Sequence, residues 1–215
     1  MRKLVVFTGA GMSAESGIQT FRDSGGLWEQ HDVMEVASID GWNKNPNLVQ
    51  EFYNQRRRQL KKCKPNKGHK NLVKLEEYFD VQIITQNVDD LHERAGSKNV
   101  LHLHGELTKS RDVNGIVYDI GYNDITDNMY RPDIIWFGEN VPLLKEAIGI
   151  VEKADEFVVI GSSLSVYPAA GLLDYVQCWP IWLIDPNIVY KPDASIQYIF
   201  EKASKGTTIL MKFII

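Results

Sequence analysis

Short apolar runs recur along the chain and are separated by segments with a helical pattern of apolar positions. The runs are four or five residues long and lie at residues 4–7, 81–85, 100–103, 157–160 and 181–184. Each run is followed within a few residues by Gly, Asn, Asp or His. Such runs are typical of strands that are buried on both faces of a parallel sheet. Helices are expected between several of them, for example at residues 70–78 and 143–154. The alternation predicts an α/β fold with a mainly parallel sheet and helices on both of its faces.

Two stretches depart from this alternation. Residues 24–68 contain a Gly-rich turn and then a charged helix at residues 48–62, and residues 105–131 are polar with the character of a hairpin or loop. We expect both stretches to form a smaller lobe over the sheet. One domain, residues 1–215, would then have a large lobe (residues 1–23, 69–104 and 132–215) and an inserted small lobe (residues 24–68 and 105–131). The C-terminal residues 207–215 fit a helical stripe, although Thr207 and Thr208 favour a strand.

Composition excludes several classes of protein. The 215 residues are 44% hydrophobic and 24% charged, which is an ordinary balance for a globular domain. The net charge is −4 and there is no basic tail, so we expect no nucleic-acid partner. The apolar start is too short for a signal peptide, and no run approaches a membrane span. We predict a cytoplasmic monomer without a membrane partner.

The first predicted strand leads into a glycine-rich turn. Residues 9–14 read Gly-Ala-Gly-Met-Ser-Ala and fit the dinucleotide-binding fingerprint of Rossmann-like sheets. Gly9 would permit the tight turn, and Gly11 would let the backbone approach a pyrophosphate. A turn that needs glycine only for packing explains this pattern alone equally well. A dehydrogenase would add a second strand ending in an acid about twenty residues on; no such strand follows, so simple hydride transfer is disfavoured.

Polar side chains follow the second predicted strand. Gln86, Asn87 and Asp89 come just after residues 81–85, and ligands bind at the carboxyl ends of parallel strands. Amide and carboxylate groups at such a position can hold ribose hydroxyls or a carboxamide. Asp89 or Asp90 could instead cap a short helix at residues 91–95. Asn87 beside Gln86 is harder to explain as a cap.

Two histidines close the third predicted strand. His102 and His104 would share one face if that strand is regular. A histidine beside a nucleotide cleft suits general base catalysis because its pKa lies near neutrality. A single histidine is more often a structural hydrogen-bonding group. Position favours His104 as the chemical residue and allows the structural role for His102.

Five segments, in this order, resemble the motifs of the sirtuin family, and the resemblance covers almost the whole chain. They are residues 9–18 followed by Phe21 and Arg22, residues 86–89, His104-Gly105, residues 135–139 and residues 161–169. The resemblance implies a catalytic domain that consumes NAD to remove an acyl group from a protein lysine. Nicotinamide and O-acyl-ADP-ribose would be the products, and acylated proteins or peptides the partners.

The resemblance also implies roles for individual residues. Asn87 and Asp89 would hold the nicotinamide half, the acyl oxygen would attack the ribose carbon, and His104 would deprotonate a ribose hydroxyl. Phe21 would shield the ribose cation, and Arg22 would order the cofactor loop. The implied NAD-binding set is Gly9, Ala10, Gly11, Ser13, Phe21, Arg22, Gln86, Asn87, Asp89, His104, Gly161, Ser162, Ser163, Asp185, Asn187 and Ala203. The implied set around the substrate peptide, which would bind by strand addition, is Ile135, Phe137, Gly138, Glu139, Ser165 and Val166.

The choice of acyl group depends on Tyr53 and Arg56. These residues are three apart in the predicted helix at residues 48–62 and therefore share a face. A phenol and a guanidinium there could bind a carboxylate together, although spacing alone favours a solvated charged face with Tyr53 as packing. The pair looks like the one in sirtuins that remove succinyl and malonyl groups, and Thr20 also resembles that branch. The resemblance therefore implies a preference for succinyl- or malonyl-lysine over acetyl-lysine.

The chain departs from the family at its zinc site. Most sirtuins bind zinc through two Cys-x-x-Cys pairs between the His-Gly and the Trp-Phe-Gly segments. Between Gly105 and Trp136 this chain has no cysteine and no histidine, and its aspartates are poor ligands for tetrahedral zinc. We predict no zinc. A hairpin at residues 115–121 would hold this segment instead, through apolar contacts of Ile116, Val117, Tyr118 and Ile120.

Two other functions use the same features. The activated ribose of NAD can pass to water or to a protein acceptor, as in an NAD glycohydrolase or an ADP-ribosyltransferase. A non-catalytic NAD-sensing module is the other alternative, because the zinc site is missing. The peptide-binding segments argue against the first, and His104 with Asn87 argues against the second.

Overall fold

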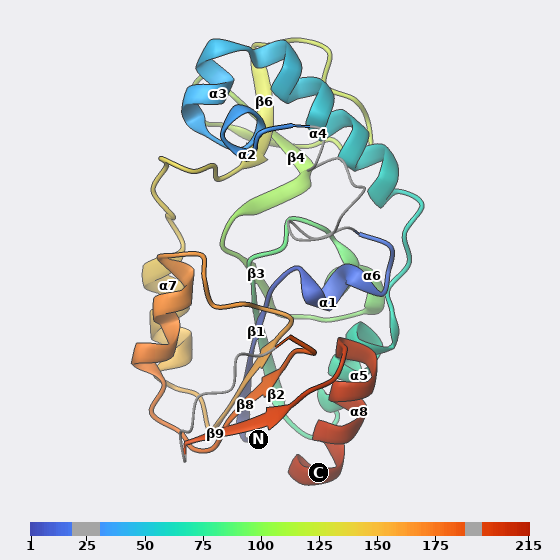
Figure 1. The fold of residues 1–215 in the computed structure, drawn as a ribbon, viewed down its shortest axis with the longest axis vertical. Helices are drawn as coiled ribbons and strands as arrows, with labels where there is room; N and C mark the ends of the chain where they lie inside the picture. Colours follow the sequence, from blue (N-terminus) through green and yellow to red (C-terminus); the bar gives the residue numbers. More distant parts are fainter. Residues whose placement is uncertain (19–30, 188–194) are drawn as a thin grey trace.

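A six-stranded sheet forms the lower half of the computed structural model (Figure 1), which describes residues 1–18, 31–187 and 195–215. All recorded pairings between its neighbouring strands are parallel. The strand order is β3 (Val100–His102), β2 (Asp80–Thr85), β1 (Lys3–Thr8), β7 (Glu156–Ile160), β8 (Ile181–Ile184) and β9 (Ile196–Ile199). Five of these strands are confirmed to within one residue at each end. β9 was missed because its sequence has no continuous apolar run.

Helices cover both faces of this sheet, as predicted. Leu4 and Val6 of β1 face one apolar cluster, which contains side chains of α5 (Lys67–Leu75) and α8 (Ala203–Ile214). Val5 and Phe7 face the other cluster, with α7 (Leu144–Val151) and the 3₁₀ helix η1 (Ala169–Tyr175). All four β1 side chains are fully buried. Burial on both faces explains why the central strands have apolar side chains at successive positions.

The C-terminal residues, whose sequence fitted both a helix and a strand, form the helix α8. Thr207 Oγ1 donates to Ala203 O at 2.8 Å, and Thr208 Oγ1 donates to Ser204 O at 2.8 Å. Asn71 Nδ2 of α5 donates to both threonine hydroxyls. The helical conformation therefore gives hydrogen-bond partners to the hydroxyl groups of Thr207 and Thr208, the two residues that favour a strand.

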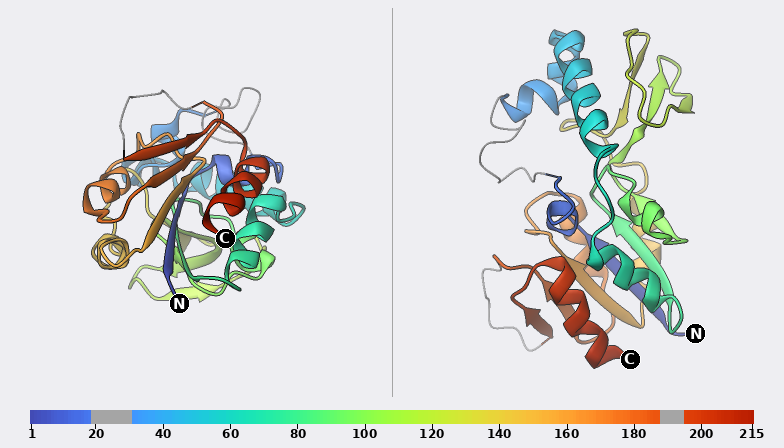
Figure 2. Two further views of the ribbon diagram at one scale, coloured as in Figure 1. Left: turned by 90° about the horizontal axis from the view of Figure 1, so that it is seen from below. Right: turned by 90° about the vertical axis from the view of Figure 1, so that its right-hand side faces the viewer.

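A second layer lies above the sheet (Figure 1) and contains a three-stranded antiparallel sheet in the order β5-β4-β6. Figure 2 shows this layer at one end of an elongated molecule. Its strands are β4 (Gly105–Asp112), β5 (Val117–Asp119) and β6 (Tyr130–Ile134), and its helices are α2 (Val33–Val36), α3 (Ile39–Lys44) and α4 (Pro46–Leu60). The predicted charged helix is thus confirmed as α4, which begins two residues early because Asn45 caps it and Pro46 occupies its first turn.

The hairpin at residues 115–121 is confirmed as the β4–β5 pair, but three of the four residues expected to supply its apolar contacts are exposed. Ile116, Val117 and Tyr118 are 55%, 47% and 40% exposed. The reason is that α4 packs on β4 and β6, whereas β5 lies at the edge of the small sheet.

Polar side chains of α4 hold the segment between β5 and β6. Asn54 Nδ2 donates to Ile125 O, and Ile125 N donates to Asn54 Oδ1, both at 2.9 Å. Gln50 Nε2 donates to Tyr130 O at 2.8 Å. The fully buried Arg57 donates to Leu107 O and to Asn54 Oδ1. We call Gln50, Asn54 and Arg57, with these partners, the α4 clasp.

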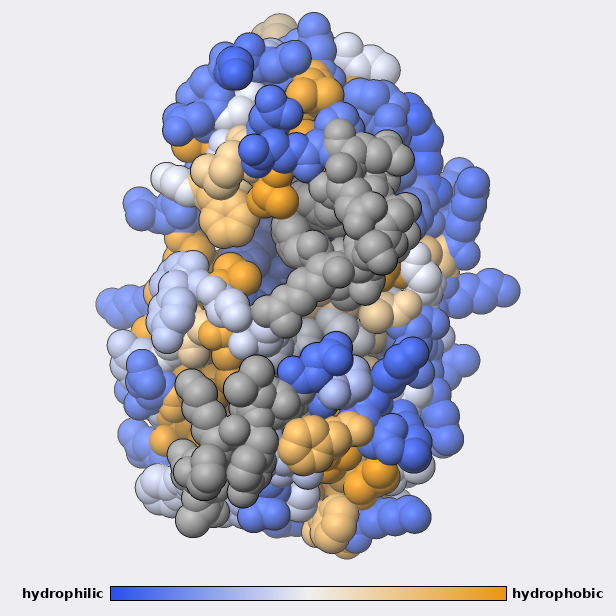
Figure 3. All heavy atoms as spheres, in the orientation of Figure 1, coloured by the Kyte–Doolittle hydropathy of each residue, from blue (hydrophilic) through white to orange (hydrophobic). Residues whose placement is uncertain are grey.

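Hydrophilic residues dominate the upper and right-hand margins of the face shown in Figure 3, and apolar residues form small separate groups. No helix within the described ranges, residues 1–18, 31–187 and 195–215, has the length and apolar character needed to cross a membrane.

Replacement of Asn54 by Ala should lower the free energy of unfolding by about 2–3 kcal/mol, because it leaves buried polar groups of Ile125 and Arg57 unpaired. Urea denaturation followed by circular dichroism measures this change. Gln55→Ala is the matched control, since Gln55 is only half-buried and bonds to the exposed Glu51; it should cost less than about 0.5 kcal/mol. Equal unfolding midpoints for the two variants would contradict the role of the clasp.

Candidate functional site

A cavity of about 880 Å³ lies between the carboxyl ends of the central strands and the small sheet. The turns after β1, β2, β7 and β8 form one side of it. They meet at β1, whose two neighbours in the sheet, β2 and β7, lie on opposite sides of it. This is the switch point at which open parallel sheets bind ligands. Residues of α4 and the segment after β6 form the other side.

Every predicted site residue that the structure describes lines this cavity. From the strand ends these are Gly9, Ala10, Gly11, Ser13, Gln86, Asn87, Asp89, His104, Gly161, Ser162, Ser163, Asp185, Asn187 and Ala203. From the opposite side and the loop after β7 they are Tyr53, Arg56, Ile135, Phe137, Gly138, Glu139, Ser165 and Val166. Thr20, Phe21 and Arg22 lie outside the described residues.

Three glycines bring the turns after β1 and β7 into backbone contact. A Cβ atom on Gly9 would lie 2.7 Å from Gly161 O, and one on Gly11 would lie 2.7 Å from Gly161 Cα. Gly161 itself has φ +63°, and a Cβ atom there would lie 2.3 Å from Met12 N. The packing explanation for these glycines is therefore correct. It does not exclude binding, because the same contact presents the backbone of both turns to the cavity.

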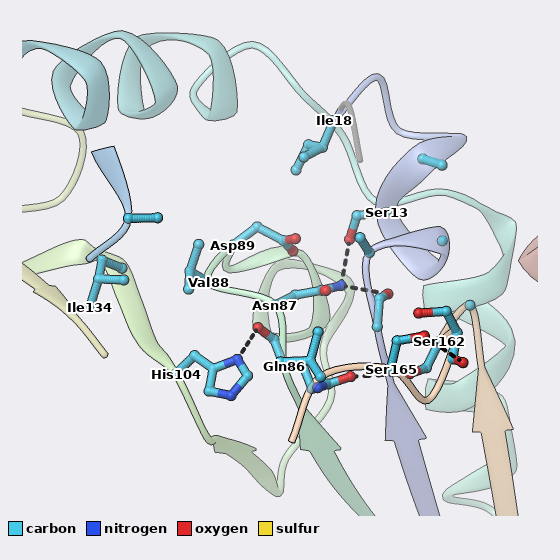
Figure 4. Close-up of a pocket in the computed structure, with 18 of the residues that line it drawn as sticks. Ser13, Ile18, Gln86, Asn87, Val88, Asp89, His104, Ile134, Ser162 and Ser165 are labelled. Carbon is cyan, nitrogen blue, oxygen red and sulfur yellow. Dashed lines mark hydrogen bonds between the residues drawn. The ribbon is translucent and has the colours of Figure 1, made fainter. Parts of the chain in front are cut away.

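Asn87 connects the turn after β2 to the turn after β1 (Figure 4). Its Nδ2 donates to Gly9 O at 3.0 Å and to Ser13 Oγ at 3.3 Å, and its backbone N donates to Thr85 Oγ1 at 3.0 Å. These bonds fix the amide plane and use its nitrogen. The amide oxygen is then the group that Asn87 can offer to a ligand as an acceptor.

Asp89 is both a cavity residue and a cap. It is 4% exposed, and its Oδ1 accepts from Leu91 N at 3.1 Å, at the start of α6 (Leu91–Ala95). Burial raises the pKa of Asp89, while hydrogen bonds from Ser13 and Leu91 oppose that rise. Asp90 instead bonds to Tyr122 Oη and makes no side-chain cap.

The two histidines have different surroundings. β3 ends at His102, so the regular strand on which they would share a face does not reach His104. His102 is buried, and its ring nitrogens bond to Asn87 O at 3.0 Å and to Glu93 Oε1 at 2.8 Å. His104 Nδ1 lies 3.2 Å from Gln86 O, and a dashed line in Figure 4 marks this hydrogen bond. A carbonyl can only accept, so Nδ1 carries the proton and Nε2 is the basic nitrogen of His104.

A buried hydrogen-bonded layer supports these turns. Thr8 Oγ1 donates to Thr85 Oγ1 at 2.8 Å and lies 3.2 Å from His92 Nε2. Since the single hydroxyl proton of Thr8 is used, His92 must donate through Nε2. His69 lies against His92, with ring centroids 4.9 Å apart, and its Nδ1 accepts from Asn66 N. His69 is therefore neutral, because a protonated imidazole has no nitrogen that can accept.

The two buried histidines, His69 and His92, predict that the fold loses stability in acid. Burial lowers the pKa of His69 from 6.5 to about 4, with Glu93 partly opposing this shift, and burial lowers that of His92 as well. Below about pH 6.5 these two histidines bind more protons in the unfolded chain than in the folded chain, so their contribution to the free energy of unfolding falls as the pH falls toward 4. Between pH 7.0 and 5.5, His69 should account for about 1 kcal/mol of this loss. Urea denaturation at both pH values should show a smaller loss for His69→Gln, and parallel losses would contradict the assignment.

Comparisons with known proteins agree with this geometry. A model of the Sir2 family matches residues 9–168. The chain belongs to the Sir2 family. The resemblance to sirtuins is confirmed at this level.

Two curated relatives of this family member are named NAD-dependent protein deacylase. The protein from Helicobacter pylori is 56% identical over 196 residues, covering 87% of this chain and 84% of the relative. The protein from Bacteroides thetaiotaomicron is 50% identical over 231 residues, covering 100% and 99%.

Two solved structures agree in fold. A Sir2 homologue in complex with NAD has a TM-score of 0.88 at 37% identity, covering 98% of this chain and 88% of the other. A Sir2 structure with a deacetylated p53 peptide and 3′-O-acetyl ADP-ribose has a TM-score of 0.82 at 31% identity, covering 99% and 94%.

Sequence analysis gave no role to Trp136 and Arg131, which hold part of the cavity wall. Trp136 is 3% exposed, and its Nε1 donates to Tyr53 Oη at 2.9 Å. Arg131 forms two 2.8 Å bonds to the carboxylate of Glu139. A buried tryptophan normally finds an acceptor for its N–H, but the sequence does not reveal which residue supplies that acceptor.

Proposed function

We propose that this protein removes succinyl or malonyl groups from protein lysines, in preference to acetyl groups, at the expense of NAD. Its membership of the Sir2 family makes it an NAD-dependent protein deacylase, with NAD as the co-substrate. The preference for succinyl and malonyl groups over acetyl groups is the part of the proposal that goes beyond family membership. The observation that carries it is that Tyr53 and Arg56 line the same cavity as Asn87 and His104.

The cavity has the features that NAD requires. The glycine turns at Gly9, Gly11 and Gly161 present closely spaced backbone to a diphosphate. Ser162 Oγ donates to Gln86 Oε1 at 3.1 Å, which orients both side chains at the same edge. When bound, NAD supplies an electrophilic ribose carbon at which the acyl oxygen of the substrate lysine displaces nicotinamide.

His104 is suited to act as the general base. Its Nδ1–H is held by Gln86 O, so Nε2 is available to take a proton from a ribose hydroxyl. Burial lowers the pKa of His104, with the bond to Gln86 opposing this shift, so the neutral, basic form predominates at pH 7. Asn87 and Asp89 provide acceptor groups beside it for the nicotinamide half.

Tyr53 and Arg56 form a receptor for an acyl carboxylate. Burial raises the pKa of Tyr53, so its phenol stays protonated and can donate. Partial burial lowers the pKa of Arg56, while Tyr53 and Asp89 oppose this shift. A carboxylate in this setting would accept charge-assisted hydrogen bonds, which are roughly twice as strong as neutral ones. An acetyl group has no carboxylate, and its one acceptor is the amide oxygen that attacks the ribose carbon.

The segment after β6 supports binding of an extended peptide. Phe137 N donates to Ala37 O, and Glu139 N donates to Trp136 O. These bonds fix the segment and use two of its N–H groups, so an incoming strand would pair with Gly138 between them. Ser165 and Val166 would flank the peptide from the loop after β7.

Replacement of Arg56 by Met should lower kcat/KM for a succinylated peptide about 10- to 100-fold, because it removes charge-assisted bonds of about 1.5–3 kcal/mol. The value for the acetylated peptide should change less than about threefold. Steady-state kinetics on the two peptides with NAD measures the ratio. Arg58→Met is the matched control, because the half-exposed Arg58 bonds to Asp124 and Glu51 outside the cavity. Equal losses on both peptides would refute the acyl assignment.

Product analysis by mass spectrometry tests the activity itself. The deacylase should yield nicotinamide and O-acyl-ADP-ribose only when acylated peptide is present, and His104→Ala should abolish formation of O-acyl-ADP-ribose. Plain ADP-ribose without peptide would indicate an NAD glycohydrolase. NAD binding without turnover would indicate a sensing module.

We also propose that the protein folds and acts without zinc. The α4 clasp supports this proposal, because it supplies contacts that hold the segment between β5 and β6. Within the described residues there is no group of three or more His, Cys, Asp or Glu that could hold a metal ion. Elemental analysis of purified protein should find well below one zinc per chain, and a chelator should not change Tm. Stoichiometric zinc would refute the proposal.

A further inference from the structure

The hydroxyl of Tyr53 is bonded before any substrate arrives. Trp136 Nε1 donates to Tyr53 Oη at 2.9 Å, inside an apolar cluster in which both residues are almost fully buried. The guanidinium of Arg56 lies 5.7 Å from the centroid of the Tyr53 ring. The phenolic oxygen therefore already accepts a hydrogen bond from the indole, beside a second group that can only donate, before a substrate binds.

These donors determine where the phenolic proton can point. A phenol has one O–H donor and two lone pairs, whereas an indole N–H and a guanidinium can only donate. Because neither Trp136 nor Arg56 offers an acceptor, the hydroxyl proton of Tyr53 cannot bond to either of them. It must point toward another acceptor, and the side chain lines the cavity. Polarisation by the indole donor also makes the O–H a stronger donor.

Trp136 is itself held in place from several directions. Its backbone N donates to Glu139 Oε2 at 2.8 Å, and the guanidinium of Arg131 lies 3.7 Å from its ring centroid. Arg131 is fixed in turn by its two bonds to Glu139 and by a 2.8 Å bond to Ile134 O. The cation over the indole ring withdraws charge and strengthens donation by the indole N–H.

We infer that Trp136 is a specificity-positioning residue: its indole N–H fixes the Tyr53 hydroxyl so that the phenolic proton is directed to the carboxylate of a succinyl or malonyl group. Arg131 and Glu139 hold the indole in position for this role. The inference rests on the proposed acyl preference, and it extends the site beyond Tyr53 and Arg56. A purely structural Trp136 would support acetylated and succinylated substrates equally.

The test is a double-mutant cycle with Trp136→Phe and Tyr53→Phe. Trp136→Phe keeps an aromatic ring and removes the N–H, so the ratio of kcat/KM for succinyl over acetyl peptide should fall roughly five- to tenfold, mainly through KM. Tyr53→Phe should lower the ratio at least as much. In the Tyr53→Phe background, Trp136→Phe should change the ratio less than about twofold, because the hydroxyl through which it acts is gone.

Trp42→Phe is the matched control. Its ring lies 5.4 Å from that of Trp136 and belongs to the same cluster, so it reports the effect of the same substitution on packing. The succinyl-to-acetyl ratio should stay within about twofold of the wild-type value. A comparable fall in this variant would overturn the inference in favour of packing.

Further outcomes separate this inference from the proposed function. If Arg56→Met leaves the ratio intact, the acyl preference itself is wrong. If Arg56→Met collapses the ratio but the effects of Trp136→Phe and Tyr53→Phe multiply independently, only the role of Trp136 is wrong.

If Trp136→Phe does not fold, an encoded benzothienyl-alanine at position 136 keeps the ring size and replaces the N–H by sulfur. An unchanged ratio with this residue would overturn the inference.

Discussion

The contact between the turns after β1 and β7 is the constraint on which the site depends. Gly9 and Gly11 lie against Gly161 so closely that no side chain fits between them. The amide of Asn87 then reaches Gly9 O from the turn after β2, and Thr8, Thr85 and His92 support the same turns from below. Three strand ends are thereby fixed relative to one another without any ligand, and a dinucleotide can bind without ordering them first.

The sequence allowed the central strands, the cavity residues and the family to be predicted, because each leaves a local signal. Buried strands have continuous apolar runs, and the glycine and amide motifs follow them directly. The contacts of Trp136 and the α4 clasp left no such signal. Most of them join residues far apart in the sequence, such as Asn54 with Ile125, 71 positions apart, and Tyr53 with Trp136, 83 positions apart. The exposure of Ile116 was missed for a related reason, since a hairpin sequence does not reveal what packs over it.

The small lobe shows how a polar network can hold a segment that has little apolar surface. Arg57 is fully buried, and burial lowers its pKa to about 10, with the carboxylate of Asp124 partly opposing the shift. Hydrogen bonds to a backbone carbonyl and to Asn54 offset part of the cost of desolvation. Such a network tolerates little change, because loss of one member leaves the others buried and unpaired. The same network positions α4, and therefore Tyr53 and Arg56, at the cavity wall.

Selectivity for an anionic acyl group would arise from the state of the protein before binding as much as from the final contacts. Arg56 lies where burial works against its charge, while Tyr53 and Asp89 stabilise that charge only in part. An acyl carboxylate would complete this stabilisation, whereas an acetyl group would displace water from the guanidinium and return nothing. Discrimination then includes a penalty on the wrong substrate, which a flexible or solvated arginine could not impose. Rigid placement of the Tyr53 hydroxyl by Trp136 serves the same end, because a donor fixed in advance gains more from the right ligand and adapts less to the wrong one.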